Sequence, residues 1–244
     1  MVAVHDEALP ELEEIAGYLT SNWPDTPPLS NVSRKGNVVT FNWGEAVASL
    51  TLFPMPMPWQ HLEGPCAAAW YWPEATTVMR GHPRHVLVTL IDEGRDPIEK
   101  SLRLTRLVAA VAACCDANGI FWGPGRMVHP PDEFLEVSRE MTREHLPLFL
   151  WIDFRLEQIG PQAYRLYTTG LEPLGQREIE VERYDGDPQT IVAAVYNVAH
   201  YALEQQKPLR HGDTIGAGEG ERIASVHHDS SMLDPDQSVI RLEF

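Results

Sequence analysis

Apolar residues recur along the chain with two different periods, and these periods separate predicted helices from predicted strands. A spacing of three to four residues is typical of a helix with one buried face. This spacing predicts four helices, which begin near residues 7, 96, 130 and 187. In the second helix, Asp96 is an N-cap candidate, Pro97 takes the first helical position, and Glu99 stands where a capping box needs it. We expect this helix to end at Asn118-Gly119, because such a pair favours a left-handed cap.

Alternating or β-branched apolar runs predict the strands. Residues 38–53 predict a hairpin that turns at Asn42-Trp43-Gly44. Residues 85–91 are apolar almost throughout, which predicts a strand buried on both faces. Residues 146–160 predict one long strand that pairs with the segment after Gly160, and residues 176–185 alternate like an exposed strand. Two further strands are expected near the end of the chain.

The order of these elements predicts an α+β fold, with a mixed, largely antiparallel sheet or sheets flanked by helices. An arrangement in two similar halves also fits this order.

The net charge of the chain indicates which kinds of partner it can bind. The chain has 35 acidic and 19 basic residues, for a net charge of -16. Such a field repels phosphate backbones and anionic membranes, and it attracts basic surfaces. No basic stripe interrupts it, so neither nucleic acid nor a membrane is an expected partner. A basic protein is the expected partner, although the charge also has a plain role in keeping the chain in solution.

The sequence lacks the usual patterns of a secreted protein, a membrane protein and a metal- or cofactor-binding protein. The N-terminus carries acids where a signal peptide needs a basic region, and the longest apolar run, residues 107–115, is too short to span a bilayer. Three cysteines give neither a disulfide framework nor a zinc pattern, which favours a cytoplasmic protein. The glycine-rich segments lack phosphate-binding spacing, and His227 and His228 are adjacent rather than spaced like metal ligands. We therefore expect no metal and no cofactor.

Few residues have a pattern that indicates catalysis. Cys66 is the best candidate nucleophile, but a cysteine among alanines is more often a small buried residue. Asp153 lies in an apolar strand two residues before Arg155, and a structural ion pair is the simpler interpretation. An enzyme would need these side chains to line one cleft with aromatic residues. The possible cleft residues are Trp70, Trp72, His129, Asp153, His227, His228 and Ser231.

Several segments, in order, resemble a bacterial family of unknown function, DUF4261. They include LEGPCAAAWYWPEA, HVLVTLID, GIFWGPG, LPLFLWIDFRL, YTTGLEPLGQREIEV and VHHDSSM, and the resemblance runs from about residue 47 to residue 244. This extent implies that residues 1–45 form an N-terminal helical extension that includes the start of the first hairpin. Residues 46–244 are then expected to form a single α+β domain. The family brings no catalytic residues that can be carried over to this chain. The resemblance implies a small bacterial cytoplasmic protein, and it associates such proteins with secretion systems and toxin immunity.

Two functions of different classes remain. The leading hypothesis is a non-enzymatic protein-binding protein, in its most concrete form an immunity protein that neutralises a bacterial toxin by direct binding. Its partner-binding residues are then expected in acidic loops, namely Asp92, Glu93, Asp96, Asp213, Glu219 and Glu221. The rival is a small hydrolase that uses the cleft residues above, and a weaker third alternative is an accessory subunit of a larger assembly.

Overall fold

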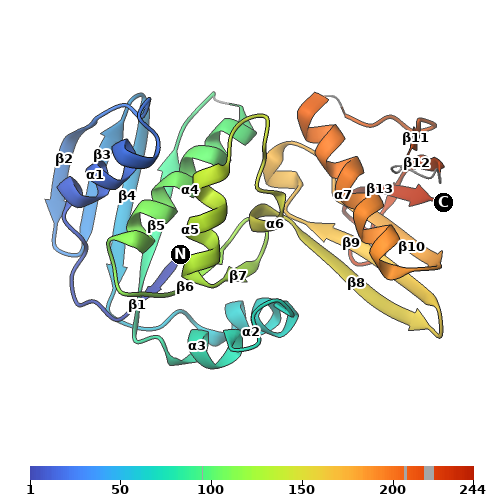
Figure 1. The fold of residues 1–244 in the computed structure, drawn as a ribbon, viewed down its shortest axis with the longest axis horizontal. Coiled ribbons are helices and arrows are strands. Elements are labelled where there is room, and N and C mark those ends of the chain that lie inside the picture. The colour runs from blue at the N-terminus through green and yellow to red at the C-terminus, as the bar shows by residue number, and fades with distance from the viewer. Residues whose placement is uncertain (95, 206–207, 217–222) are drawn as a thin grey trace. The chain divides into compact units, whose positions relative to one another are not determined.

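The chain folds into two compact units, Met1–Leu150 and Trp151–Phe244, each with its own sheet. The structure is a computed structural model that describes residues 1–94, 96–205, 208–216 and 223–244 (Figure 1). The two mostly antiparallel sheets and their helices confirm the predicted α+β class. The division falls at Leu150, however, rather than near residue 45 as the sequence suggested. The first residues are no extension, because Val2–Val4 form a buried strand inside the first sheet.

The sheet of the first unit places its N-terminal strand between two strands that come much later in the chain. Val2 pairs with Val86 on one side and with Ile120 on the other, both in antiparallel register. Because this strand has only three residues, it shows no periodicity that sequence reasoning could detect. The strand order is β2 (Leu29–Lys35), β3 (Val38–Trp43), β4 (Ala46–Phe53), β5 (Arg84–Ile91), β1 (Val2–Val4), β6 (Ala117–Trp122) and β7 (Met127–His129).

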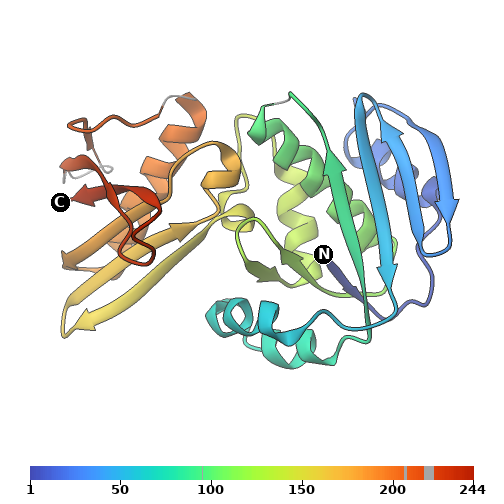
Figure 2. The same ribbon diagram turned by 180° about the vertical axis from the view of Figure 1, so that it is seen from behind.

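Helices cover the two faces of this sheet unequally (Figures 1 and 2). One face is packed by α4 (Pro97–Ala113), with α1 (Leu12–Asn22) and α5 (Pro131–Glu140) beside it. On the other face, α2 (Trp59–Ala68) and α3 (Ala75–Gly81) pack on β6 and β7, and Ala3 of β1 belongs to the same core cluster. The predicted hairpin of β3 and β4 is confirmed, with Trp43 opposite Ala46.

The second helix begins as predicted but ends earlier. Asp96 caps α4 by accepting a hydrogen bond from the backbone N–H of Ile98 at 2.9 Å. The helix stops at Ala113, and the expected stop signal at Gly119 lies inside β6 instead. A side chain at Gly119 would place its Cβ 2.4 Å from the sulfur of Met79 and 2.8 Å from the ring of Trp72. The glycine is therefore needed for close packing of the strand against neighbouring side chains, and not for a helix cap.

Strand β5 is buried on one face only, which corrects the prediction that both faces are covered. Val86, Val88 and Leu90 point into the core, whereas Leu87 and Ile91 are 42% and 54% exposed. An apolar run predicts a strand, but it does not reveal which side the helices cover.

The second unit is a smaller sheet with one long helix against it. α7 (Pro188–Gln205) packs on β8, β9 and β10. The centre of the Tyr196 ring of this helix lies 5.7 Å from the centre of the Phe154 ring of β8. β10 and β13 pair in parallel, and the other described pairs are antiparallel. The order is β11 (Thr214–Gly216), β12 (Ile223–Ser230), β13 (Ser238–Glu243), β10 (Ile179–Asp185), β9 (Ala163–Thr169) and β8 (Asp153–Gly160).

Two predicted strands of this region differ from the structure. Residues 148–151 form a single helical turn, α6 (Leu148–Trp151), so the long strand begins only at Asp153. β10 lies between β9 and β13 rather than at an exposed position, and its residues Ile179, Glu180 and Val181 are buried. Its alternating glutamates gave the pattern of an exposed strand, but Glu180 is only 2% exposed and has buried polar partners.

Candidate functional site

The possible cleft residues are divided between the two units. Trp70, Trp72 and His129 belong to the first unit, and Asp153, His227, His228 and Ser231 belong to the second. Within the first unit the two tryptophans have opposite environments. Trp70 is 87% exposed, whereas Trp72 lies in the core cluster under α2 and α3 together with Cys66 and Met79.

His129 is a core residue held between aromatic rings. Its ring stacks on Tyr71 at 6.1 Å and lies 5.7 Å from Phe134, and its Nε2 donates to the carbonyl of Leu150 at 3.2 Å. Burial lowers the pKa of His129 to about 4. The side chain is therefore neutral at neutral pH, and packing is its evident role.

This burial predicts a loss of stability in mild acid. The unfolded chain, with a histidine pKa of about 6.5, binds more protons than the folded chain between pH 6.5 and pH 4. Stability is therefore complete above pH 6.5 and falls as the pH is lowered, with His129 contributing a loss of about 2 kcal/mol at pH 5. Urea unfolding measures the free energy of unfolding at pH 7 and at pH 5. The decrease between the two should be smaller in His129→Gln than in the wild type by this amount. An equal loss in both proteins would contradict the prediction.

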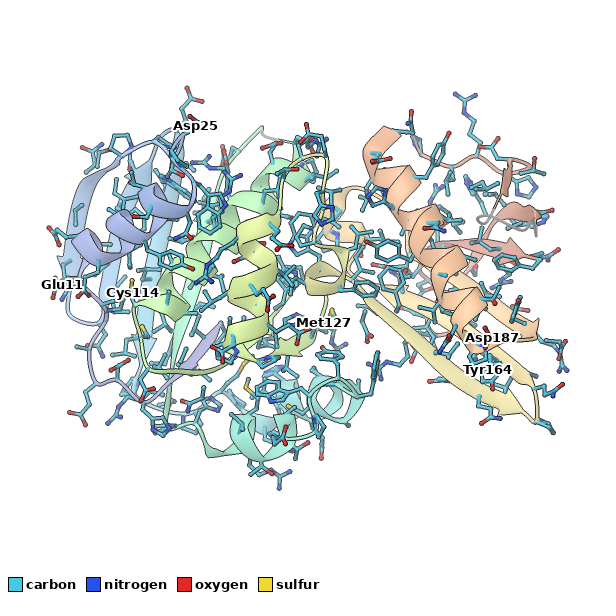
Figure 3. All side chains as sticks on the ribbon, viewed as in Figure 1. Glu11, Asp25, Cys114, Met127, Tyr164 and Asp187 are labelled. Carbon is cyan, nitrogen blue, oxygen red and sulfur yellow. The ribbon has the colours of Figure 1, made fainter. Side chains whose placement is uncertain are left out.

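Cys66 has the properties of a core thiol. It lies near the end of α2 rather than at a helix start, and it is 5% exposed. Burial raises the pKa of the Cys66 thiol to about 11, so the thiolate needed for nucleophilic attack is scarce at neutral pH. Cys114, labelled in Figure 3, follows the last residue of α4, and burial also raises the pKa of its thiol.

In the second unit, Asp153 is far from the two histidines. Arg155 binds Asp153 with its Nη2 at 2.5 Å, which confirms the predicted ion pair. Asp153 lies on the edge strand β8, and three strands separate it from β12, which carries His227 and His228. At about 4.8 Å between neighbouring strands, the separation is about 19 Å. No hydrolytic site can combine these residues directly.

The two histidines and Ser231 serve local structure. His228 donates from Nε2 to the carbonyl of Leu209 at 2.7 Å, so its Nδ1 is free to accept from Arg177 at 3.2 Å. His227 lies 3.6 Å from the carboxylate of Glu243. Across the ranges that the structure describes, no group of three or more histidine, cysteine or acidic side chains is arranged to hold a metal ion.

Two buried glutamates on and beside β10 each hold a neighbouring loop in place. Glu178 accepts from the backbone N–H groups of Gly170, Leu171 and Glu172 at 2.8–3.1 Å, and from the hydroxyl of Thr168 at 2.7 Å. These bonds fix the loop that connects β9 to β10.

The second loop connects β12 to β13. Glu180 accepts from the hydroxyl of Ser231 and from the backbone N–H of Met232 at 2.9 Å. The Ser231 oxygen in turn accepts from the backbone N–H of Leu233 at 3.0 Å. Ser231 therefore organises a turn, and its hydroxyl proton is directed at a carboxylate rather than at a base that would activate it.

A hollow of about 600 Å³ lies between these two loops. It falls within the size range of ligand sites, but its walls are polar and charged. Arg177 is the single cation among the lining residues that the structure describes, and it already contacts His228. Such walls suit a polar, positively charged group better than an apolar molecule. They are formed by Glu172, Gln176, Arg177, Glu178, Asp234, Asp236, Gln237 and Ser238.

Sequence reasoning placed the partner-binding acids elsewhere. Asp92 is 7% exposed and pairs with Arg103 at 2.5 Å, so it has almost no surface for a partner. Asp96 caps α4 and pairs with Arg143 at 2.8 Å, and Asp213 accepts from the backbone N–H of Arg210.

Of the other predicted acids, Glu93 is exposed, and Glu219 and Glu221 lie outside the described residues. The hollow was missed, although the run LDPDQS between two predicted strands was a detectable signal of an acidic turn.

Every residue that lines the hollow falls within one segment that matches a known family. No curated protein and no solved structure matches the chain. Within the part of the chain that the structure describes, no helix combines the length and the apolar character needed to cross a membrane. Residues 47–166, which the sequence also led us to compare with the same family, lie outside the match. Residues 167–243 match the family model described as Domain of unknown function (DUF4261), which confirms the resemblance to that family over this segment of the second unit.

Proposed function

We propose that this protein is a non-enzymatic binding protein, and that the hollow of its second unit receives a basic group of a protein partner. The observation that carries the proposal is the hollow itself, whose described lining residues include four carboxylates, from Glu172, Glu178, Asp234 and Asp236, and one arginine. A chain with a net charge of -16 attracts a basic partner over long range, and a polar hollow on preformed loops then offers acceptors for its cations.

The preformed loops favour binding in a second way. The backbone and hydroxyl donors that face Glu178 and Glu180 hold both walls of the hollow before any partner arrives. A site that is ordered in advance loses less conformational entropy on association. This supports recognition of a partner surface by a rigid acidic site.

In its most concrete form, the proposal is a cytoplasmic immunity protein that neutralises a secretion-system toxin by direct binding. This form rests on the family resemblance and on the charge. The partner would be a basic toxin or effector domain whose active site the protein occludes.

The first experiment is an affinity pull-down of the tagged protein from its own producing cells, at low and at high salt. One stoichiometric partner that is lost as salt rises is the expected result, because screening weakens attraction between opposite charges. A partner retained equally at both salt concentrations would contradict the electrostatic part of the proposal. Absence of any partner at low salt would contradict the proposal as a whole.

Charge reversal at the hollow should weaken binding of that partner. The double variant Glu172→Lys/Asp236→Lys changes two exposed lining acids and moves the net charge from -16 to -12. We expect its Kd to rise by at least about tenfold, since rim charges set both association rate and register. Calorimetric titration of the purified pair measures this change.

A matched control separates a local effect from the effect of total charge. Glu63→Lys/Glu140→Lys makes the same change in net charge at exposed positions of α2 and α5 in the first unit. We expect a much smaller rise in Kd for this control. Equal weakening by both double variants would show that the hollow has no special part in binding.

A further inference from the structure

One face of the first sheet is exposed and carries no charge over nine positions. The outward residues of β3, β4 and β5 align in three rows across the strands, in register. They alternate with the buried residues of the same strands, so they point away from α4. We call these nine residues the uncharged face: Val38, Thr51 and Leu87; Thr40, Ser49 and Thr89; Asn42, Val47 and Ile91.

The described helices leave this face open. α2 and α3 contact β6 and β7 on the same side of the sheet, while α1, α4 and α5 lie on the opposite side (Figure 2). Val47, Leu87 and Ile91 are 42%, 42% and 54% exposed. Three large apolar side chains are thus exposed to solvent on the same face of the sheet.

The absence of charge is unusual for this chain. Charged residues make up 22% of the sequence, and solvent-facing sheet positions normally carry many of them. The second unit shows the contrast. There, the exposed positions of β10 carry the charged residues Glu182, Arg183 and Asp185.

A second copy of the chain fits the uncharged face better than a basic partner does. Two molecules of net charge -16 repel each other wherever their carboxylates meet, and this face brings none together. A basic protein would gain no ion pair from nine neutral side chains. Apolar and β-branched residues, in contrast, pack well against the face of a second sheet.

The charges at the two ends of the face are complementary under a two-fold axis. Lys35 pairs with Val38 in register and so extends the first row at one end. Glu45 lies in the turn beyond the third row at the other end, and the exposed Glu93 follows Ile91. A two-fold axis that reverses the strand direction places Lys35 of each copy next to the acidic end of the other.

We propose that the uncharged face is the contact surface of a homodimer, in which β3, β4 and β5 of two copies pack face to face and antiparallel. Nine positions form a smaller contact than the roughly 800 Å² per partner of a standard interface. The dimer is therefore reversible, with a dissociation constant in the micromolar range. This inference is independent of the basic partner proposed for the second unit.

Sedimentation velocity of the full chain over a concentration series tests the proposal. As the protein concentration rises, the wild type is expected to shift from monomer to dimer, and the dimer should be detectable by about 100 μM. Val47→Lys places a charge in the third row, and its dissociation constant should rise by at least about tenfold. Ile159→Lys is the matched control, because Ile159 is a strand residue of the second unit with a similar exposure of 44%. It should leave the dimer unchanged.

A charge swap tests the antiparallel arrangement. Lys35→Glu and Glu45→Lys should each weaken the dimer, and the double variant should restore it. Circular dichroism and urea unfolding of each variant exclude loss of the fold as the cause. A wild type that is monomeric at about 100 μM would overturn the proposal, as would a dimer that Val47→Lys leaves intact. Failure of the double variant to restore the dimer would overturn the antiparallel arrangement.

Discussion

Replacing Asp92 with alanine is expected to destabilise the protein by about 3–5 kcal/mol, because it leaves a buried guanidinium without its carboxylate. Asp92 and Arg103 form an ion pair whose side chains are 4% and 10% exposed. Arg103 also donates to the carbonyl of Trp43, and its guanidinium lies over the Trp43 ring at 4.7 Å. The pair thus connects the end of β5 to α4 and to the β3–β4 turn.

Urea unfolding at neutral pH measures this loss. Glu93→Ala, at the exposed next residue, is the control and should change the free energy of unfolding by less than about 0.5 kcal/mol. The double variant Asp92→Leu/Arg103→Met should recover much of the loss, since removing both charges removes the uncompensated one. A double variant as unstable as Asp92→Ala would contradict this explanation and would favour a packing role for the two side chains.

The same residue shows where sequence reasoning fails. Asp92 follows an apolar strand and precedes Glu93, Gly94 and a helix cap, so its position is typical of a solvated acidic loop. Its partner Arg103 is eleven residues away and is one of the buried residues of α4. Local patterns report exposure only on average, and a long-range ion pair leaves no periodic signal.

Elements with strong local signals were predicted well. The capped start of α4, the β3–β4 hairpin and the helix after Pro188 each combine apolar periodicity with a proline, glycine or capping residue. The three-residue strand β1 has no such signal, because its place in the sheet is set by pairing with residues that are eighty or more positions away. The predicted boundary near residue 45 followed the extent of the family resemblance, and without β1 nothing in the sequence tied the first residues to the first sheet.

The candidate site could not be predicted from local sequence patterns for a related reason. The hollow is formed by two loops that are about sixty residues apart in the sequence, and β10 and β13 bring them together through a parallel pairing. Glutamates at positions 178 and 180 looked like the solvent side of an exposed strand. In the structure both are buried and serve as acceptors for loop donors.

That arrangement makes Glu178 the most consequential residue of the second unit. Glu178→Ala removes the acceptor of three backbone N–H groups and one hydroxyl, in a position where water has little access. Each buried donor without a partner costs about 1–3 kcal/mol, so we expect a destabilisation of at least about 3 kcal/mol, concentrated in residues 168–172. Glu178→Gln keeps one carbonyl acceptor, so its free energy of unfolding should lie between those of Glu178→Ala and the wild type.

Hydrogen exchange separates this local effect from general loss of stability. The amides of Gly170, Leu171 and Glu172 should be protected in the wild type and should exchange rapidly in Glu178→Ala, under conditions where β12 and β13 remain protected. Glu182→Ala on the same strand is the control, because Glu182 is 56% exposed and its ion pair with Arg241 is worth at most about 1 kcal/mol. If the three amides stay protected in Glu178→Ala, the loop holds its shape without the carboxylate. The hollow would then owe its form to packing of the loop, and the exposed acids Glu172, Asp234 and Asp236 would remain as its contribution to binding.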